Sequence, residues 1–500
     1  MIKLDNVTYR YRDEDQPALK SINLEIGPGE SVCVMGANGS GKSTFARLLS
    51  GLLNVQQGQL KISSPRSRPI PVGMIFQNPD NQMVAVTVEK ELAFALENLG
   101  YAQSDMDKLI GHNLQKFNIV HLRQRLTTEL SGGEKQRVAL ASVMIFQPDI
   151  LVLDEPESFL DEEGKAALGE ELINIKKQRP SMIQIHISQY PYVASRYERL
   201  LVFDRGEVIA DDAPQNILAD MDLCERAGLR FTNRAGQRVV IPSQTDRGGR
   251  SGSGALGSVE VDKIRFAYSD SDYVLRNLSC TVRAGGIVGV VGPSGTGKST
   301  LGSLICGILK PTDGRVCYLD RNGNLVDPET VAGRVSGVFQ QPERQFFLPT
   351  CTEEIAFGPK NLGQRLDSQN VEALFAMAGL DADTFADRDP FTLSGGEKRR
   401  LAFAAVLSMS PDFVVFDEPT CGLDQEGVGR FILLARGLRE KGVGLVIISH
   451  DGQIMRSLAD SIVYLRSDAG NLVMSCDEFF ENPLYRKVVS PVDQLDLPGQ

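Results

Sequence analysis

The chain has 500 residues, which at about 100–200 residues per domain suggests two to five domains. Its 53 Lys and Arg against 64 Asp and Glu give a net charge of −11, which argues against a general nucleic-acid-binding protein. No apolar run approaches the roughly 20 residues that span a bilayer, and the N-terminal residues lack the apolar core of a signal peptide. The eight cysteines form no CxxC pair, which favours single buried thiols in a reducing compartment. We therefore expect a soluble, cytosolic protein of several domains that does not bind nucleic acid.

In the first half, the apolar pattern predicts a series of alternating strands and helices. In chain order these are strands at Ile2–Val7 and Ser31–Met35, a helix at Lys42–Leu52, a helical stretch at Glu89–Leu99, a helix from Ser131, a strand at Ile150–Leu153, a helix from Asp161 and a strand at Met182–Ile187. Short continuous apolar runs such as DILVLD favour a parallel sheet that is covered on both faces. The fold class is therefore α/β.

Four motifs occur twice in the same order: a glycine-rich loop, an FQ motif, an LSGGEK motif and a DEP motif. The lysine of the loop recurs after 256 residues, from Lys42 to Lys298, whereas the glutamate of DEP recurs after 263, from Glu155 to Glu418. The seven extra residues are best placed in DRNGNLVDPE from Asp320, where Asn-Gly predicts a β-hairpin. The chain is thus a tandem repeat. We expect domains at 1–244 and 259–500, joined by a flexible Gly/Ser-rich linker at 245–258.

Each half has a glycine-rich loop that follows a strand and opens a helix, the context of a phosphate-binding loop. Its glycines let backbone N–H groups surround a phosphate, its lysine reaches the phosphate oxygens, and the next serine, Ser43 or Ser299, can ligate Mg²⁺. The residues expected to bind phosphate groups are Gly36, Asn38, Gly39, Ser40, Gly41, Lys42, Ser43 and Thr44 in the first copy and Gly292, Ser294, Gly295, Thr296, Gly297, Lys298, Ser299 and Thr300 in the second.

Two neighbouring carboxylates end an apolar strand in each half, and a proline follows them. The aspartates, Asp154 and Asp417, can hold Mg²⁺ directly or through water. The glutamates, Glu155 and Glu418, can polarise an attacking water, so they are the candidate catalytic residues.

Both halves resemble ATP-binding-cassette ATPases, and the resemblance covers nearly the whole chain. The most specific motif is LSGGEK, which contains Ser131, Gly132 and Gly133 in the first half and Ser394, Gly395 and Gly396 in the second. The resemblance implies that these residues contact the γ-phosphate of ATP bound to the opposite cassette. The two halves would then pair within one chain and close head-to-tail on two Mg-ATP. Each would have a mainly parallel sheet core, an antiparallel β subdomain and a helical subdomain. The family usually has glutamine where Glu134 and Glu397 stand.

The resemblance implies roles for three more positions of the repeat. Gln77 and Gln340 match the glutamine that approaches Mg²⁺. Tyr11 and Tyr268 match the aromatic residue that stacks on adenine, although a tyrosine there could also fill a strand edge. His450 matches the switch histidine that contacts the γ-phosphate.

The first half lacks an evident switch histidine. Counting back from the LLVF strand leaves Ser188 or Gln189 at the equivalent place, and the match of SQ to SH favours Gln189. His186 lies three residues early, and we interpret it as an ordinary strand residue. The two ATP sites are therefore expected to be unequal.

The loops FQNPDNQ and FQQPERQFF resemble those of the paired ATPases of energy-coupling-factor transporters. That resemblance implies import of a vitamin or transition-metal ion through a transmembrane scaffold subunit and a substrate-binding membrane subunit. The chain would lie peripherally at the cytoplasmic face of the cell membrane. Asn81, Gln82 and Phe346 are expected to line the contact with a partner helix.

Three other interpretations of the sequence remain. NPDNQ could be a simple solvent turn. The chain could serve a sugar or peptide importer. It could also be a soluble cassette protein of translation or DNA repair, which the short linker and the lack of CxxC disfavour.

Overall fold

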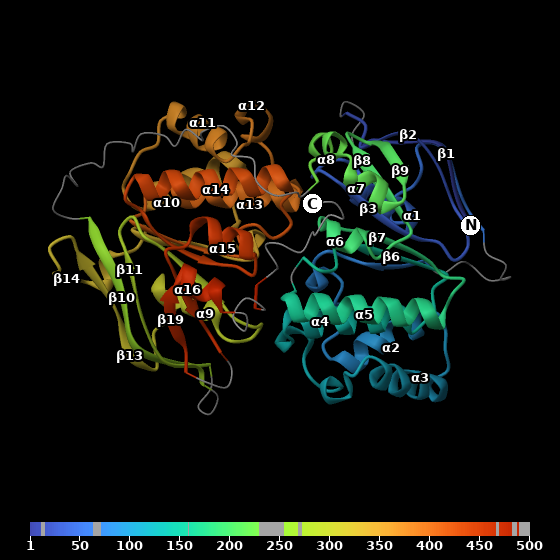
Figure 1. Ribbon diagram of the computed structural model, residues 1–500, viewed down its shortest axis with the longest axis horizontal. Helices are drawn as coiled ribbons and strands as arrows, with labels where there is room; N and C mark the ends of the chain where they lie inside the picture. Colours follow the sequence, from blue (N-terminus) through green and yellow to red (C-terminus); the bar gives the residue numbers. More distant parts are fainter. Residues whose placement is uncertain are drawn as a thin grey trace. The chain divides into compact units, whose positions relative to one another are not determined.

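The computed structural model describes residues 1–11, 16–63, 72–158, 160–229, 255–268, 273–466, 470–482 and 488–489. Apart from the four residues Gly422–Gln425, the chain divides into two compact units, Met1–Thr232 and Asn233–Gln500 (Figure 1). No helix in the described ranges combines the length and the apolar character needed to cross a membrane.

The first unit contains a six-stranded and a three-stranded sheet. The large sheet has the order β5 (Val72–Ile75), β6 (Ile150–Asp154), β7 (Ile183–Ile187), β3 (Ser31–Gly36), β8 (Arg199–Asp204) and β9 (Glu207–Asp212), and only β9 pairs antiparallel to its neighbour. The small antiparallel sheet has the order β2 (Leu19–Ile26), β1 (Ile2–Tyr9) and β4 (Gln57–Ile62). The helices are α1 (Lys42–Leu49), α2 (Val88–Asn98), α3 (Gln103–Lys116), α4 (Gly132–Met144), α5 (Glu162–Gln178), α6 (Pro191–Ala194), α7 (Pro214–Ala219) and α8 (Met221–Arg226).

The large sheet of the first unit is buried on both faces. Along β6, Leu151 and Leu153 join the core formed with α2, α3, α4 and α5, whereas Ile150 and Val152 join the core shared with α1 and the small sheet. Successive strand side chains point to opposite faces, so a strand that is covered on both sides must be apolar throughout. This explains the continuous run ILVLD, all of which is buried.

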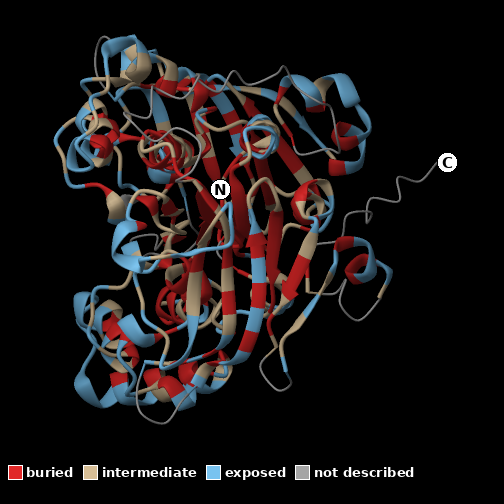
Figure 2. Cartoon of the chain, turned by 90° about the vertical axis from the view of Figure 1, so that its left-hand side faces the viewer, coloured by how far each residue is buried: buried red, intermediate tan, exposed pale blue. Residues whose placement is uncertain are grey.

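The second unit repeats this plan. Its large sheet has the order β15 (Val335–Val338), β16 (Phe413–Asp417), β17 (Gly444–Ile448), β12 (Ile287–Val291), β18 (Ser461–Tyr464) and β19 (Leu472–Ser475). Its antiparallel sheet has the order β11 (Tyr273–Arg283), β10 (Leu256–Ala267), β13 (Asp313–Asp320) and β14 (Leu325–Val326). The helices are α9 (Lys298–Ile305), α10 (Cys351–Asn361), α11 (Ser368–Met377), α12 (Ala382–Phe385), α13 (Gly395–Leu407), α14 (Gln425–Glu440), α15 (Gly452–Leu458) and α16 (Cys476–Glu481). Buried residues follow the strands, and exposed residues gather on outer helix faces and loops (Figure 2).

The predicted elements of the first half are present, with ends that shift by one to three residues. The helix predicted at Lys42–Leu52 ends at Leu49, since Ser50 caps it and Gly51 turns into the left-handed region with φ 74°. The hairpin predicted from Asp320 is confirmed, because β13 and β14 pair Leu319 with Leu325.

The linker prediction needs one correction. Residues 245–254 lie outside the described ranges, but Leu256–Ser258, which we assigned to the linker, belong to β10. Leu256 is fully buried in the core of the second unit and pairs with Asp320. One apolar side chain that is anchored in the core thus extends the strand into a glycine-rich sequence. The domain boundary itself stays a prediction.

Candidate functional site

The glycine-rich loop of each unit joins a central strand to the N-terminus of a helix, β3 to α1 and β12 to α9. Gly36 has φ 146°, and a Cβ there would lie 2.1 Å from the carbonyl oxygen of Phe203 on β8. Gly292 has φ 155°, and a Cβ there would lie 2.5 Å from the carbonyl oxygen of Leu465. Both positions therefore require glycine, because φ is positive and another backbone segment lies where a Cβ would be.

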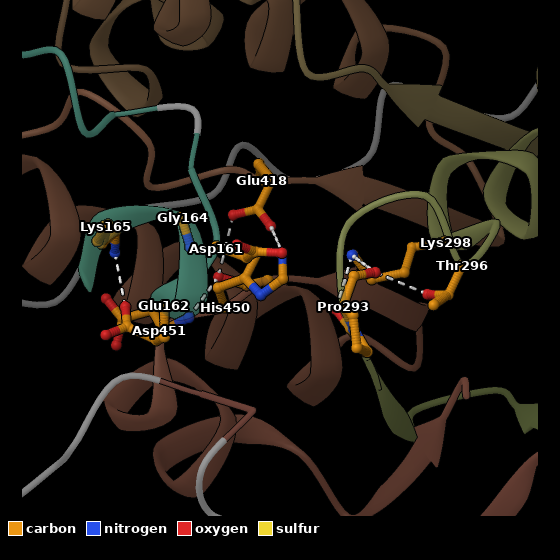
Figure 3. A network of polar contacts seen from close by, with 12 residues as sticks. Asp161, Glu162, Gly164, Lys165, Pro293, Thr296, Lys298, Glu418, His450 and Asp451 are labelled. Carbon is orange, nitrogen blue, oxygen red and sulfur yellow. Dashed lines mark hydrogen bonds and ion pairs between the residues drawn. The ribbon is translucent and has the colours of Figure 1, made fainter. Parts of the chain in front are cut away.

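The loop lysines are held by carbonyl oxygens of their own loops. Lys42 Nζ donates to the carbonyls of Gly36 and Ala37, both over 2.8 Å. Lys298 Nζ donates to the carbonyls of Gly292 and Pro293 over 2.8 and 2.9 Å (Figure 3). Burial lowers the pKa of Lys42, although Glu155 and Asp154 oppose this shift. Each lysine thus places a cation beside a ring of backbone amides at a helix N-terminus, an arrangement that suits phosphate.

The carboxylates of the first unit lie directly after β6. Ser43 Oγ donates to Asp154 Oδ1 over 3.1 Å, which joins the loop to the strand end. Burial raises the pKa of Asp154, and burial raises the pKa of Glu155 to about 7 although the charge of Lys42 opposes it. Gln77 Nε2 donates to Glu155 Oε2 over 2.9 Å. The predicted residues Ser43, Gln77, Asp154 and Glu155 therefore lie together.

The second unit repeats this cluster. A hydrogen bond joins Ser299 to Asp417, whose pKa burial raises to about 6. Glu418 receives a hydrogen bond from Ser449 Oγ over 3.4 Å, and His450 Nε2 lies 3.7 Å from Glu418 Oε1 (Figure 3). Gln340 follows the end of β15, where its carbonyl oxygen accepts from Arg399 over 3.0 Å.

Both candidate catalytic glutamates have an unusual backbone conformation. Glu155 has φ 48° and Glu418 has φ 49°, in the left-handed region that side chains with a Cβ seldom adopt. Each is anchored by its backbone N–H, which donates to the carbonyl of Ile187 over 3.0 Å or of Ile448 over 2.8 Å. This conformation is thus a feature of the repeat that fixes the direction of both glutamate side chains, as it is at three other pairs of equivalent positions.

The sheet register places Gln189 at the position of His450. In the first unit Asp154 pairs with Ile187, two residues before Gln189. In the second unit Asp417 pairs with Ile448, two residues before His450. His186 instead lies within β7, where Glu157 and Tyr197 contact its two ring nitrogens over 2.9 and 2.6 Å.

One exposed tyrosine lies beside the glycine-rich loop of each unit. The Tyr11 hydroxyl lies 3.1 Å from Thr44 Oγ1, and the Tyr268 hydroxyl lies 3.0 Å from Thr300 Oγ1. Both rings are exposed and contact an aromatic neighbour edge-on, which leaves ring surface accessible. The tyrosines are thus not buried fillers of a strand edge, and each is held next to the first turn of the loop helix.

A family model described as ABC transporter matches residues 19–158 and 275–421, which together exceed half of the chain. The chain belongs to the ABC transporter family. It is a tandem ATP-binding-cassette ATPase and an ATP-binding component of an ABC transporter. Each matched segment contains its own glycine-rich loop and its own pair of carboxylates.

Two relatives and one solved structure show how far the similarity extends. An ABC transporter ATP-binding protein of Bifidobacterium longum is 31% identical over 92% of this chain, which spans 64% of that relative's length. A Bacillus subtilis protein named for HMP/thiamine import, YkoD, is 29% identical over 93% of this chain and 90% of its own length. An archaeal ribosome recycling factor, solved with a ribosomal stalk protein, has a TM-score of 0.60 at 20% identity over 95% of this chain and 90% of its own. The last likeness shows the fold alone.

The donor set of each cassette fits Mg²⁺. Ser43 with Asp154, and Ser299 with Asp417, bring a hydroxyl and a carboxylate oxygen together at the edge of the phosphate loop. Mg²⁺ prefers such oxygens and usually takes its remaining ligands from water and substrate phosphates. When bound, the ion neutralises phosphate charge. The roles of these ligands stay a proposal.

The ABC signature residues begin a helix in both cassettes. Ser131 and Ser394 are the N-caps of α4 and α13, and Glu134 and Glu397 complete a capping box at each. Gly132, Gly133, Gly395 and Gly396 occupy the first two helical positions, whose amides have no partner within the helix. Because glutamate closes the capping box, the departure from the usual glutamine preserves the helix start. The binding of an opposite nucleotide stays a prediction.

The prediction for Phe346 is wrong. Its side chain is 6% exposed, whereas the next residue, Phe347, is 60% exposed. The chain is extended at Phe346, so consecutive side chains point in opposite directions and only one can face solvent. Asn81 is exposed as expected, but Gln82 is half-buried and its Oε1 accepts from the backbone N–H of Phe76 over 3.3 Å.

Sequence reasoning missed the buried glutamates that hold these loops. Glu91 Oε2 accepts from the backbone N–H groups of Val84 and Ala85 over 3.0 and 2.7 Å. Glu354 makes the same pair of contacts with Phe347 and Leu348 in the second cassette. The signal was available, because a glutamate occurs at the same offset from both FQ motifs.

Proposed function

We propose that this tandem cassette ATPase energises a membrane importer of a vitamin or transition-metal ion. It would lie at the cytoplasmic face of the membrane, bound to a transmembrane scaffold subunit and a substrate-binding membrane subunit. The likeness to the B. subtilis protein named for HMP/thiamine import supports this proposal, because that likeness covers 93% of this chain and 90% of the relative.

The observation that carries the proposal is an apolar surface that follows the glutamine loop in both cassettes. In the first cassette Val84 is 63% exposed and Phe94 on α2 is 46% exposed. In the second, Phe347 is 60% exposed and contacts the ring of Phe357 edge-on, with 4.7 Å between the ring centres. Exposed apolar side chains at equivalent positions of a repeat are typical of a partner-binding surface. A membrane subunit that presents an apolar helix would cover them.

This apolar surface is connected to the ATP-binding parts of the first cassette. Gln77 contacts Glu155 at one end of the loop, and Lys135 of α4 forms an ion pair with Asp80 over 2.6 Å at its centre. Movement of the signature helix would therefore shift the loop that carries Val84. This arrangement is suited to transmitting nucleotide binding to a partner.

In the proposed cycle the two cassettes pair head-to-tail on two Mg-ATP. Lys42 and Lys298 would hold the phosphates, and Glu155 and Glu418 would orient and polarise the attacking water. Because the two cassettes belong to one chain, their pairing is intramolecular, and the effective concentration of one cassette around the other is raised.

Co-purification tests the proposal. The chain would be expressed with the membrane-protein genes that lie beside its own gene, and its complex isolated in detergent. We expect a stable complex whose ATP hydrolysis supports uptake of a vitamin or metal ion into proteoliposomes. Uptake of a sugar or peptide would show that the proposed substrate class is wrong. Stable association with ribosomes or DNA, and not with membrane subunits, would overturn the whole proposal.

A further inference from the structure

The first unit contains a cavity of about 260 Å³ that no part of the proposed ATP cycle uses. Helix α5 contributes one wall with Leu168 and Leu172, and the segment from α6 to β8 contributes another with Tyr192, Val193 and Arg196. Strand β7 and the DEPE segment contribute the remaining wall. The volume is below the range typical of drug-sized ligands, so it suits a molecule with a single ring.

Glu157, His186 and Tyr197, which line this cavity, belong to a buried polar network. Ser188 Oγ donates to Glu157 Oε1, and Glu157 Oε2 lies 2.9 Å from His186 Nε2. His186 Nδ1 lies 2.6 Å from the hydroxyl of Tyr197. Burying such groups costs stability even when they are paired, and well-packed apolar residues at the same place are often more stable.

The second unit is apolar at some of the same positions, although Thr420 and Ser449 stand as buried hydroxyl residues where the first unit has Glu157 and Ser188. The offsets set by the DEP motif and by the β7 and β17 registers align His186 with Ile447, which is fully buried. They also align Lys165 with Val428 and Leu168 with Phe431, and Phe431 packs on two other phenylalanines. The fold therefore does not require the buried pair of Glu157 and His186. Its presence in one unit calls for a function that the other unit does not share.

The cavity offers hydrogen-bond donors and net positive charge. The hydroxyl of Tyr192 is buried and finds no partner among the described residues, and burial raises its pKa, so it stays protonated as a donor. Lys176, Lys177 and Arg196 line the cavity with positive charge, against the carboxylates of Glu157 and Glu198. Lys165, by contrast, is neutralised by Glu162 over 2.8 Å.

Glycine on α5 makes room for the cation at the cavity wall. A Cβ at Gly169 would lie 1.8 Å from Nη1 of Arg196, so the guanidinium rests directly on the helix backbone. The same guanidinium lies 5.7 Å from the ring centre of Tyr192, which orients it by a cation–π contact. Ile432 occupies the corresponding position of the second unit.

We propose that this cavity binds a small organic anion with an apolar ring, which acts as a regulator of the first ATP site. The ring would pack on Leu168, Leu172 and Val193, while its carboxylate would accept from Tyr192 and pair with Arg196. Glu157 lines the cavity and follows Glu155 by two residues, and Ser188, which donates to Glu157, directly precedes Gln189. Ligand occupancy is thereby coupled to the Glu155–Gln189 pair, and this coupling rests on the proposed ATP site.

Calorimetric titration of the full chain tests the binding, with benzoate as the probe. We expect benzoate to bind at least about tenfold more tightly than benzyl alcohol, which lacks the charge, and inorganic phosphate, which lacks the ring. Arg196→Gln should weaken benzoate binding about tenfold, and Tyr192→Phe about threefold to tenfold for one lost hydrogen bond. Arg226→Gln and Tyr101→Phe are matched controls on the surface of the same unit. Equal affinity for benzoate and benzyl alcohol, no benzoate binding, or no effect of either cavity variant would overturn the site.

The coupling is tested in a Lys298→Ala background, which weakens the second ATP site. We expect saturating benzoate to change the affinity of the first site for Mg-ATP about fivefold or more, and Arg196→Gln to remove that change. If Mg-ATP binds but benzoate does not alter its affinity, the coupling is wrong while the ATP site stands. If Mg-ATP does not bind at all, the proposed ATP site fails instead, and benzoate binding is judged by the titration alone.

Discussion

Gln189 Nε2 donates to Glu155 Oε1 over 2.8 Å, so an amide occupies the place that His450 has beside Glu418 in the second unit. A second bond joins the same amide nitrogen to Asn38 Oδ1 over 3.0 Å. The amide is neutral at every pH, whereas imidazole can carry a positive charge. If both sites bind ATP as proposed, they would therefore offer different electrostatic support to the phosphate during hydrolysis.

The first prediction is an unequal response to loss of the glutamates. Glu418→Gln should nearly abolish ATP turnover, while Glu155→Gln should leave a substantial fraction. The reason is that the first site has Gln189 in place of the switch histidine and should already be slow. Loss of one preorganised group directed at transition-state charge costs about 10²–10³ in rate, or roughly 3–4 kcal/mol. Steady-state hydrolysis by the two variants at saturating Mg-ATP measures this. Equal losses would mean that both sites must hydrolyse ATP in each cycle.

The second prediction concerns Gln189 itself. In a Glu418→Gln background, where the first site provides the remaining turnover, Gln189→His should raise the rate about tenfold or more, because imidazole adds a charged donor. Gln178→His, on the exposed end of α5, is the matched control and should change nothing. A lower rate in the Gln189→His variant would contradict the proposed inequality of the sites.

A third prediction distinguishes two glycines of the first phosphate loop. Gly36→Ala should abolish binding of Mg-ATP, since its Cβ would lie 2.1 Å from the carbonyl oxygen of Phe203. A Cβ at Gly39 would have no atom within 4 Å, so Gly39→Ala should destabilise the loop only by the strain of its left-handed backbone, about 1–2 kcal/mol. Nucleotide affinity and the melting temperature of both variants provide the measurement. If both variants bind Mg-ATP normally, the required close approach at Gly36 is refuted.

The fourth prediction concerns the apolar partner surface. Phe347→Glu should prevent assembly with membrane subunits by placing a charge in an apolar contact, while Mg-ATP affinity stays unchanged. Leu325→Glu is the control, because Leu325 is more exposed but lies on the β13–β14 hairpin. Pull-down of detergent-solubilised subunits reports assembly. Normal assembly of the Phe347 variant would exclude this surface.

The fifth prediction is a pH-dependent loss of stability in Glu157→Gln. Burial by itself would raise the pKa of Glu157, but His186 and the hydrogen bonds from His186 and Ser188 outweigh it and hold the pKa below its usual value. A depressed pKa contributes stability above the unfolded pKa, and this stability is lost as pH falls through the folded value. Glu157→Gln should therefore lower the melting temperature clearly at pH 7, where breaking a buried pair costs about 3–5 kcal/mol, and less at pH 4.

Glu97→Gln, an exposed glutamate of the same unit, is the control for this pH series. Its melting temperature should follow that of the original chain at both values. A loss in Glu157→Gln that is larger at pH 4 than at pH 7 would refute the assigned direction of the pKa.

Local pattern predicted most of the elements and which residues of each candidate ATP site lie together. Strand β6 needs apolar residues on both faces, and the phosphate loop needs glycine wherever φ is positive, so both requirements are visible in a short stretch of residues. The hairpin after Asp320 was predictable for the same reason, because Asn-Gly suits a tight turn. The repeat then allowed each feature of one half to be compared with the other.

Which side chain faces solvent was decided by the tertiary structure. The alternation of Phe346 and Phe347 depends on the extended backbone at Phe346 and on the way Glu354 holds the next amides, and neither follows from composition. The pairing of Gln189 with Glu155 likewise needed the register of β6 and β7, because residues 34 apart meet only when two parallel strands end together. The sequence by itself determined the fold class, the two phosphate loops and the candidate carboxylates, since these depend on backbone conformation within a few residues. The tertiary structure decided side-chain direction and the cavity beside Glu157, because both arise from contacts between segments far apart in the chain.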